Sequence, residues 1–422
     1  MTGNKPIWLI FGLTLSLNSY CLDAADWPYY RGPNFDGSTA ETISANWGKG
    51  LPQAWKIQTP NGFSSFAVGG GLAVTQVSRG GTGTVLAVDA KTGEEKWAVS
   101  LGRADYGNGG GNSGAPDNKG GDGPRSTPAI DGDNVYVLSS DLELLCINAA
   151  TGKITWKKDI VKDLGGRNIR WENAASPLID GDLIFLAGGA PGKALMAINK
   201  KDGSVAWAGE DDLMTHSTPV VAEILGTRQV IFFTQKGLVS CEPKAGKVLW
   251  RYAFPYKVST AMTPIVGGDI VYCSAGYGVG SGAVKITKDG NKFKATEIWR
   301  QAGKAAKVLN HWSTPVYKDG HLYGMFSFKR YANGPMLCVE VATGKVKWSQ
   351  PGFGAGNVIR TGGNVLALTD YGELVLVAAD PAGYRELART KAVAGKCWST
   401  PSVSNGMIYA RSTKEGVCLN AQ

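Results

Sequence analysis

A Gly-x-x-x-Trp pattern recurs along most of this chain and constrains its fold more than any single residue does. A longer copy runs from Gly290 to Trp299, and weaker copies lie at Trp55 and at 383–388. The five clear copies are Gly93/Trp97, Gly152/Trp156, Gly203/Trp207, Gly246/Trp250 and Gly344/Trp348. From Trp97 to Trp348 the successive tryptophans are 59, 51, 43, 49 and 49 residues apart. Periods of about 40–50 residues with strand-like segments are typical of β-propellers, so the repeat predicts an all-β ring of blades.

One repeat, residues 126–159, shows what each blade should contain. It reads as four short strands, 126–130, 135–139, 142–148 and 153–159, separated by tight turns. Four antiparallel strands of this kind form one propeller blade. The whole chain contains eight first strands and eight fourth strands, but it begins with a lone fourth strand near Trp55 and ends with three strands in 401–419. We therefore predict an eight-bladed β-propeller of four-stranded antiparallel blades, closed by pairing of these two ends, which removes both free sheet edges.

We expect the repeat tryptophans to be structural. Each glycine can adopt the positive φ of a tight turn, and each indole would bury about 150–250 Å² between neighbouring blades. This interpretation assigns a packing role to Trp97, Trp156, Trp207, Trp250, Trp299 and Trp348.

The first 25 residues have the pattern of a secretory signal. Lys5 precedes the apolar run Ile7–Leu17, and alanines follow at positions 24 and 25. An apolar run of this length is too short to span a bilayer as a helix. We predict a signal peptide at 1–25, a leader segment at 26–50, the propeller at 51–422 and no transmembrane span in the mature chain. The protein would then be exported to the periplasm or the extracellular space.

Composition narrows the expected partners. The net charge is +9, but the lysines and arginines are spread over the repeats, which is typical of a solvated surface. Nucleic acid is therefore not an expected partner. Lipid anchoring at Cys21 is the less favoured alternative, because Tyr20 stands where a lipidation site has a small residue. The six later cysteines form no Cys-x-x-Cys pair, and we expect most of them to be small core residues.

Turn length separates the two faces of the predicted ring. Tight turns join first to second strands and third to fourth strands on one face, named the tight-turn face. The other connections lie on the opposite, long-loop face and include 101–124, 158–173, 275–282, 301–312 and 327–335. Because binding residues concentrate in loops that a rigid scaffold positions, we expect the functional site on the long-loop face.

The residues just before the first strands should surround the mouth of the central channel on the long-loop face. Cations, aromatic side chains and two of the three histidines gather there. The candidate ligand site consists of Arg125, Arg170, Trp171, His216, His311, Trp312 and Trp398, with Arg360 and Lys396 beside it. In the alternative interpretation, these side chains fill a crowded propeller axis and bind nothing.

The segment Ala87–Trp97, with the sequence Ala-Val-Asp-Ala-Lys-Thr-Gly-Glu-Glu-Lys-Trp, resembles the tryptophan-docking motif of quinoprotein, or pyrroloquinoline-quinone-like (PQQ-like), β-propellers. The segment Trp27–Gly37 resembles the opening of exported bacterial proteins of this kind. Through its repeats, the resemblance covers nearly all of the mature chain. It implies the fold, but not an activity, because non-enzymatic members carry the motif too.

In the dehydrogenases of that family, PQQ lies on the propeller axis beside Ca²⁺. The resemblance implies that Glu172 and Asn173 could supply oxygen ligands for Ca²⁺. It also implies that Arg125 or Arg170 could pair with the carboxylates of the quinone. The residues that could stack on the quinone are Trp171, Trp312 and Trp398. Two departures stand against this assignment: the adjacent cysteine pair of many such alcohol dehydrogenases is absent, and the chain lacks their long insertions.

We therefore predict an exported PQQ-like β-propeller that acts mainly as a binding or scaffold module through its long-loop face and channel mouth. Its partners would be periplasmic or outer-membrane proteins, or a small ligand at the mouth. The alternative is a dehydrogenase that depends on PQQ and calcium and oxidises an alcohol or a sugar. The sequence leaves PQQ binding and enzymatic activity open.

Overall fold

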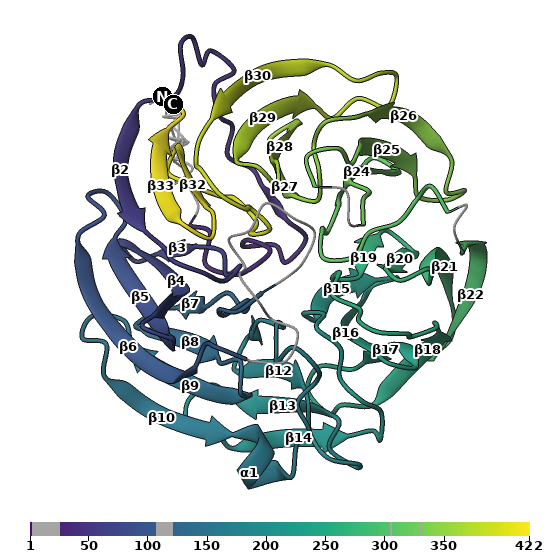
Figure 1. Cartoon of the computed structure of the whole chain (residues 1–422). Coiled ribbons are helices and arrows are strands. Elements are labelled where there is room, and N and C mark those ends of the chain that lie inside the picture. The colour runs from purple at the N-terminus through teal and green to yellow at the C-terminus, as the bar shows by residue number, and fades with distance from the viewer. Residues whose placement is uncertain (2–25, 107–120, 304–305, 329–330) are drawn as a thin grey trace.

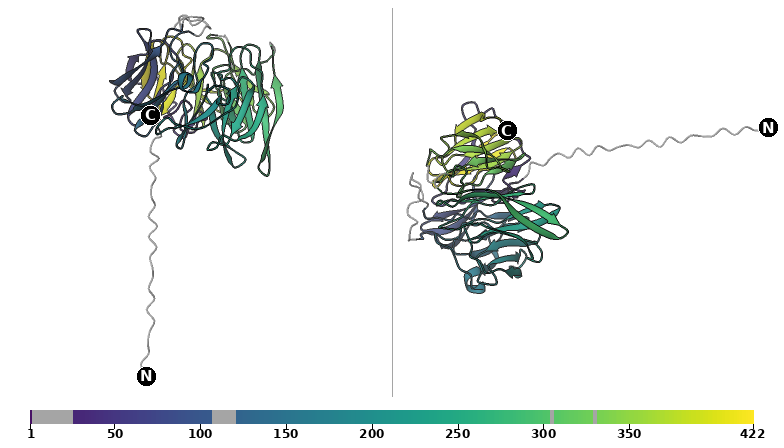
Figure 2. Two further views of the ribbon diagram at one scale, coloured as in Figure 1. Left: turned by 90° about the horizontal axis from the view of Figure 1, so that it is seen from below. Right: turned by 90° about the vertical axis from the view of Figure 1, so that its right-hand side faces the viewer.

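Eight β-sheets surround a central axis in the computed structural model (Figure 1). The structure describes residues 1, 26–106, 121–303, 306–328 and 331–422. Apart from Met1, the predicted signal peptide lies outside these described residues, as does part of the loop at 101–124. The strands run between the two faces of the ring, as the side views show (Figure 2). The prediction of an all-β, eight-bladed propeller is confirmed.

Blades are numbered in the chain order of their first strands, and each runs from a first strand at the axis to a fourth strand at the rim. Blade 1 is β3 (Ala67–Gly69), β4 (Leu72–Arg79), β5 (Thr82–Asp89) and β6 (Glu95–Arg103). Blade 2 is β7 (Ala129–Asp131), β8 (Asn134–Leu138), β9 (Glu143–Asn148) and β10 (Ile154–Asp159). Blade 3 is β11 (Leu178–Asp180), β12 (Leu183–Ala187), β13 (Leu195–Asn199) and β14 (Val205–Gly209). Blade 4 is β15 (Val220–Ile224), β16 (Thr227–Thr234), β17 (Gly237–Cys241) and β18 (Val248–Ala253).

The second half of the ring follows the same order. Blade 5 is β19 (Ile265–Gly267), β20 (Ile270–Ala275), β21 (Gly280–Asp289) and β22 (Lys292–Gln301). Blade 6 is β23 (Val316–Lys318), β24 (His321–Met325), β25 (Met336–Glu340) and β26 (Val346–Gln350). Blade 7 is β27 (Asn357–Thr361), β28 (Asn364–Leu368), β29 (Glu373–Ala378) and β30 (Glu386–Lys391), with the short strand β1 (Ser38–Thr39) added beside β27.

Blade 8 joins the two ends of the chain. Its first three strands are β31 (Ser402–Ser404), β32 (Met407–Arg411) and β33 (Glu415–Asn420), and its fourth strand is β2 (Gln53–Gln58). In this pairing Trp55 stands opposite Cys418. The predicted closure of the ring is therefore confirmed.

At six junctions an indole of one blade donates a hydrogen bond to the turn of the next. Trp97 Nε1 donates to the Ala149 carbonyl at 2.7 Å. A Cβ placed on Gly152 would lie 2.8 Å from the Trp97 side chain, and Gly152 has φ +71°. The glycine thus permits the turn and leaves space for the indole face. The equivalent bonds join Trp55 to Ala90, Trp156 to Lys200, Trp207 to Pro243, Trp299 to Val341 and Trp348 to Asp380.

Each of these tryptophans stands opposite a small residue of the third strand in its own blade. Trp97 faces Ala87, and the tryptophans at 156, 348 and 55 face Cys146, Cys338 and Cys418. A small residue there leaves the volume that the large indole fills in a close-packed core. All six described cysteines are buried free thiols, as expected of small core residues.

Two junctions lack this contact in the described part of the ring. Trp250 of blade 4 donates to Gln229 Oε1 of its own blade at 2.7 Å, because β21 and β22 of blade 5 extend for 10 residues each before they turn. In blade 7, Ala388 occupies the tryptophan position. The next blade has no turn there, because the two chain ends meet in it.

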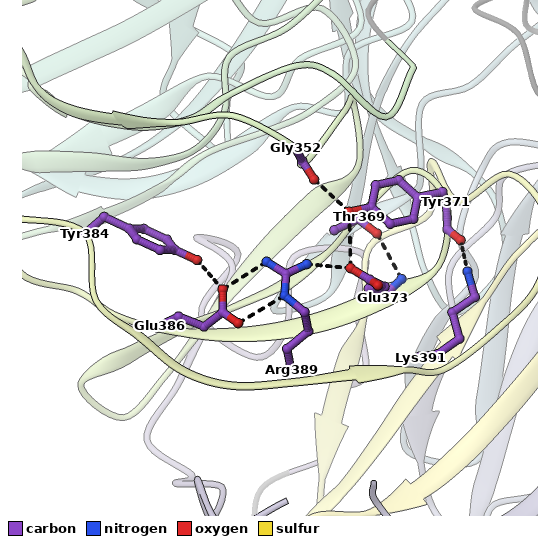
Figure 3. A network of polar contacts seen from close by, with 8 residues as sticks. All are labelled: Gly352, Thr369, Tyr371, Glu373, Tyr384, Glu386, Arg389 and Lys391. Atoms are coloured by element: carbon purple, nitrogen blue, oxygen red, sulfur yellow. Dashed lines mark hydrogen bonds and ion pairs between the residues drawn. The ribbon is translucent and has the colours of Figure 1, made fainter. Parts of the chain in front are cut away.

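Charged side chains hold the rim of blade 7 where an indole is missing (Figure 3). The Arg389 guanidinium donates to both oxygens of Glu386, at 3.0 and 2.9 Å, and also to Glu373. The Tyr384 hydroxyl donates to Glu386 at 2.5 Å. The bond to Glu386 contributes most to raising the pKa of Arg389. Because the Arg389 side chain is 32% exposed, each of these ion pairs contributes only about 0–1 kcal/mol to the free energy of unfolding.

A second set of links, the hydroxyl belt, joins the blades near the axis. It is formed by the Ser and Thr residues that precede the first strands. For example, Ser65 N–H donates to Thr127 Oγ1 at 3.0 Å, and Thr127 N–H donates to Ser176 Oγ at 2.9 Å. The other bonds run from Thr400 to Ser65, from Ser176 to Thr218, from Thr263 to Thr314 and from Thr314 to Asn357 Oδ1. Within the described residues, the belt has two gaps. In that part of the chain no such bond joins Thr218 of blade 4 to Thr263 of blade 5, or Asn357 of blade 7 to Thr400 of blade 8, and both Thr263 Oγ1 and Thr400 Oγ1 are buried without a partner.

The leader segment lies along the inner edges of several first strands, close to the tight-turn face. Val68 N–H of blade 1 donates to the Trp27 carbonyl at 2.8 Å, and Ile130 N–H of blade 2 donates to the Pro28 carbonyl at 2.9 Å. At blade 7, β1 pairs in parallel with β27. Figure 1 shows this purple segment crossing the middle of the ring.

Arg31 anchors the leader in the central channel. Its guanidinium donates to the carbonyls of Pro315 at 2.8 Å and Thr314 at 3.3 Å, and to that of Val358 at 3.4 Å. Burial lowers the pKa of Arg31, and the side chain is only 3% exposed. Carbonyl dipoles from two blades therefore hold a buried cation, which fixes the path of the leader.

The contact between indole and glycine turn can be tested with two glycines. Gly132 also has positive φ (+57°), but a Cβ there would meet nothing within 4 Å. We expect Gly132→Ala to cost about 1 kcal/mol of unfolding free energy from backbone strain alone. Gly152→Ala should cost about 3 kcal/mol, because its methyl group also displaces the Trp97 indole. Urea unfolding measures both.

The same pair in a Trp97→Ala background is the control. There the two alanine variants should be destabilised equally, since the indole is gone. Equal costs in the native background would contradict the proposed role of Gly152.

Candidate functional site at the channel mouth

The predicted site residues of blades 2–4 are positioned by the long loop after β10. The loop starts with a short helix, α1 (Ile160–Leu164), whose N-cap Asp159 accepts from two backbone N–H groups. It ends with Trp171 and Glu172, which have φ values of 69° and 61°. Such positive φ values cost about 1–2 kcal/mol per residue, so neighbouring groups must hold this turn in place.

Arg125 is one of those groups. Its guanidinium donates to the Trp171 carbonyl at 2.8 Å and to the Gly121 carbonyl, and it lies 5.2 Å from the ring centroid of Tyr106. Burial lowers the pKa of Arg125. Arg170 is exposed, with its guanidinium 4.8 Å from the Trp171 ring centroid. The Arg125 guanidinium is thus occupied by contacts within the protein, whereas the Arg170 side chain is exposed to solvent.

His216 fixes the other side of the same loop. Its Nε2 lies 3.0 Å from the Arg170 carbonyl, and its Nδ1 lies 2.9 Å from Ser259 Oγ. A carbonyl only accepts, so Nε2 carries the proton and Nδ1 accepts from the serine. Burial lowers the pKa of His216 to about 4, with a further contribution from Arg125. His216 is therefore neutral near pH 7, and both ring nitrogens are occupied.

Glu172 and Asn173, the predicted calcium ligands, are both paired within the protein. Asn173 Oδ1 accepts from Ala175 N–H at 3.0 Å, and its Nδ2 donates to two carbonyls. Glu172 accepts from Asn168 at 2.6 Å and lies 3.4 Å from Arg103. Burial raises the pKa of Glu172, with a smaller contribution from Asp141. Across the described residues, no group of three or more His, Cys, Asp or Glu side chains could hold a metal. In this arrangement the pair does not fit a calcium site.

The predicted residues of blades 6–8 meet in an arc of aromatic rings. Trp312 and Trp398 are stacked with centroids 4.0 Å apart, and Phe63 stacks on the other side of Trp398 at 4.8 Å. His311 lies edge-on to Trp312 at 5.1 Å and to Phe328 at 5.0 Å. The name aromatic arc is used for Phe63, Trp398, Trp312, His311, Phe328 and Tyr277, the last lying 4.7 Å from Phe328.

The two groups approach each other across the mouth. The charge of Arg170 acts on Tyr277 and opposes the rise that burial causes in the pKa of its hydroxyl. Arg170 of the first group and Tyr277 of the arc are therefore near enough for their charges to interact.

Trp398 carries the one unsatisfied polar group of the arc within the described residues. The side chain is 9% exposed, and Nε1 is buried without a hydrogen-bond partner. The Lys396 ammonium lies 4.7 Å from the Trp398 ring centroid. A buried N–H without an acceptor costs about 1–3 kcal/mol. A ligand that brings an acceptor to this nitrogen would recover that free energy.

Asp370 is a buried carboxylate near the arc, in the connection between β28 and β29. It accepts from Ala355 N–H at 2.9 Å and from Ala332 N–H at 3.0 Å. Burial raises the pKa of Asp370 to about 6, although both amides and the charge of Lys396 oppose the rise.

Sequence reasoning missed several members of this site, namely Phe63, Tyr106, Tyr277, Phe328 and Asp370. Of these, Tyr106, Tyr277 and Phe328 lie in the long loops that the turn lengths had marked, so the aromatic content of those loops was the available signal. Arg360 was placed wrongly. It lies within β27 and donates to the Gly362 carbonyl on the tight-turn face, because β27 begins three residues earlier, at Asn357.

These observations define the class: a β-propeller with blades joined by tryptophan–turn contacts and an aromatic arc at the channel mouth. The chain belongs to the PQQ-like propeller family described as "Outer membrane protein assembly factor BamB", which matches residues 81–350.

Two relatives carry that same name. The Shewanella oneidensis protein is 25% identical over 261 residues, which cover 58% of this chain and 61% of the relative. The Burkholderia pseudomallei protein is 26% identical over 291 residues, which cover 59% of this chain and 71% of the relative. The chain thus spans about three fifths of the length of the first relative.

The fold is also similar to that of an enzyme. The quinohemoprotein alcohol dehydrogenase from Comamonas testosteroni superposes with a TM-score of 0.64 at 16% identity, covering 93% of this chain and 80% of that chain. Identity this low shows the fold alone. Function must therefore be argued from the site.

The pKa of Asp370 gives a testable pH dependence. Because its pKa is higher in the folded than in the unfolded protein, Asp370 stabilises the fold below pH of about 4, and this contribution is lost as the pH rises through about 6. Over that range wild type should lose up to about 3 kcal/mol relative to Asp370→Asn. Urea unfolding at several pH values measures the difference. A difference between wild type and Asp370→Asn that stays constant over this pH range would contradict the assignment.

Proposed function

We propose that this protein is an exported scaffold that binds periplasmic or outer-membrane proteins through the aromatic arc and the neighbouring long loops. The observation that carries the proposal is the Trp312–Trp398–Phe63 stack with its unsatisfied Trp398 N–H. Aromatic side chains held rigidly in a partly desolvated site are typical centres of protein–protein binding energy. The exposed Arg170 would favour acidic or carbonyl-rich partner segments. The relatives named as outer-membrane assembly factors support the same class of function.

Export supports this function but remains part of the proposal. The signal-like segment at 1–25 falls outside the described residues except for Met1. None of the described segments forms a helix that is long and apolar enough to cross a membrane.

A dehydrogenase is the second candidate, supported by the enzyme fold and by the stacked indoles that could receive a planar ring. PQQ would supply the two-electron redox chemistry. Arg170 would hold its carboxylates, and Trp312 and Trp398 would pack against its ring. The paired state of Glu172 and Asn173 favours the scaffold over this candidate.

Site-specific photocrosslinking in cells tests the scaffold. A photoreactive residue at Phe328, in the aromatic arc, should crosslink to envelope proteins. The same residue at Ile154, which is 40% exposed on the rim strand β10, is the control position. Trp312→Ala should reduce the crosslinks from Phe328 by about tenfold. Crosslinks that are as abundant from Ile154, or that are unchanged by Trp312→Ala, would contradict the proposal.

The dehydrogenase makes the opposite prediction for the purified protein. PQQ with Ca²⁺ should then raise the melting temperature and support dye-linked oxidation of an alcohol or sugar panel, and Glu172→Ala should abolish both. That result would contradict the scaffold proposal and support the dehydrogenase. We expect neither effect.

A further inference from the structure

The inner edges of the first strands are binding sites for extended backbone, and the leader already uses three of them. In a hairpin with a two-residue turn, the residues that flank the turn bond to each other, so the next residue along directs its N–H and C=O to the free edge. At blade 7 this edge residue is Arg360, whose N–H donates to the Gly37 carbonyl at 2.8 Å. Val68 and Ile130 hold the equivalent positions in blades 1 and 2, where Trp27 and Pro28 accept.

The same geometry is present, but unused, at blade 4. Ile224 and Thr227 flank the two-residue turn, so Glu223 is equivalent to Arg360, and Val221 to Val358. β15 and β27 are both five residues long, whereas the other first strands have three. Within the described residues, neither Val221 nor Glu223 makes a backbone hydrogen bond outside its own sheet. β27 is covered by the leader, and β15 is not.

A cavity of about 370 Å³ adjoins this free edge. β15 forms one wall, the start of β19 forms another, and leader residues 33–36 close a third side. It lies at the junction of blades 4 and 5, on the inner side of their first strands.

The residues that line the cavity indicate which kind of ligand it would bind. Phe35, Val220 and Ile265 supply apolar surface, and Asp36 and Glu223 supply two carboxylates. The one cation of the lining, Arg228, is already paired with Asp180 at 2.5–2.8 Å. The net charge of the wall is therefore negative. At blade 7 the leader also places a cation, Arg31, on the Val358 carbonyl, which shows how an arginine can complete such an edge.

We propose that the cavity between blades 4 and 5 binds an extended, basic segment of another polypeptide by β-augmentation of β15. A carbonyl of the segment accepts from Glu223 N–H, as Gly37 does at Arg360. An arginine or lysine lies beside Asp36 and Glu223, and neighbouring aliphatic side chains pack on Phe35 and Ile265. This site lies on the tight-turn face and is independent of the aromatic arc.

Peptide binding to the full chain tests the proposal. The probes are fluorescein-labelled Thr-Val-Arg-Val-Thr, its counterpart with glutamate in place of arginine, and a counterpart methylated on the backbone nitrogens. We expect the arginine peptide to bind with a Kd below about 1 mM, and the glutamate peptide at least about tenfold more weakly. The methylated peptide should not bind, because strand pairing needs its N–H groups. Hydrogen exchange should slow at the Val221 and Glu223 amides when the arginine peptide is present.

Variants separate charge from backbone pairing. Glu223→Lys should weaken the arginine peptide by about tenfold or more and strengthen the glutamate peptide. Glu223→Gln removes the charge alone and should weaken only the arginine peptide. Glu223→Pro removes both the carboxylate and the N–H that faces the free edge, at a position where a strand tolerates proline, and should abolish binding of both peptides. Glu94→Lys gives the same change in net charge at an exposed site in blade 1 and should have no effect.

Three outcomes would overturn the site. They are no saturable binding of any peptide by about 1 mM, binding that Glu223→Lys leaves unchanged, and binding that is lost in Phe328→Ala, which would move the peptide to the channel mouth. The crosslinking test of the scaffold function uses a probe at Phe328 in the aromatic arc, whereas the peptide test uses variants of β15. The scaffold proposal can therefore fail while the β15 site stands, and the reverse also holds.

Discussion

The packing of an indole on the turn of the next blade is the contact on which this ring depends. It ties the rim of one blade to its neighbour through an apolar surface and one hydrogen bond, as between Trp97 and Ala149. The contact needs a glycine with positive φ in the turn and a small residue opposite the tryptophan. These requirements explain why Gly, Trp, Ala and Cys recur in register, and why Ala388 replaces tryptophan where no turn follows.

In the part of the ring that the structure describes, the junction of blades 4 and 5 lacks this contact between indole and turn. Blade 5 extends its rim hairpin, so Trp250 bonds to Gln229 within its own blade instead of reaching across. In the described residues the hydroxyl belt is interrupted at the same junction, with Thr263 Oγ1 left buried and unpaired. Blades 4 and 5 remain joined by bonds such as Ser217 Oγ to the Met262 carbonyl. The ring is thus closed everywhere, and at this junction other contacts stand in for the missing ones: Tyr252 donates to Glu297, and the Arg300 guanidinium lies 4.1 Å from the Phe254 ring centroid.

The blades could be predicted from sequence because each is specified locally and repeated. Turn glycines, strand lengths and tryptophan spacing gave the number of blades and the closure through Trp55. The leader could not be predicted, because its contacts are unique: Arg31 reaches carbonyls about 280–330 positions away. The mouth was predicted in part. Trp312 and Trp398 stand at repeat positions, whereas Phe63 and Tyr277 join the arc only through loop conformations that no repeat specifies.

The leader has the same form as the segment proposed to bind at β15. It is an extended chain held by backbone pairing at Val68, Ile130 and Arg360 and by one buried arginine. Catalysis on the axis would instead require polar side chains that are free to act on a substrate. At the mouth, His216 has both nitrogens occupied, and Glu172 is paired with Asn168 and Arg103. These hydrogen bonds hold the loops of the mouth in place, as the proposed binding role requires.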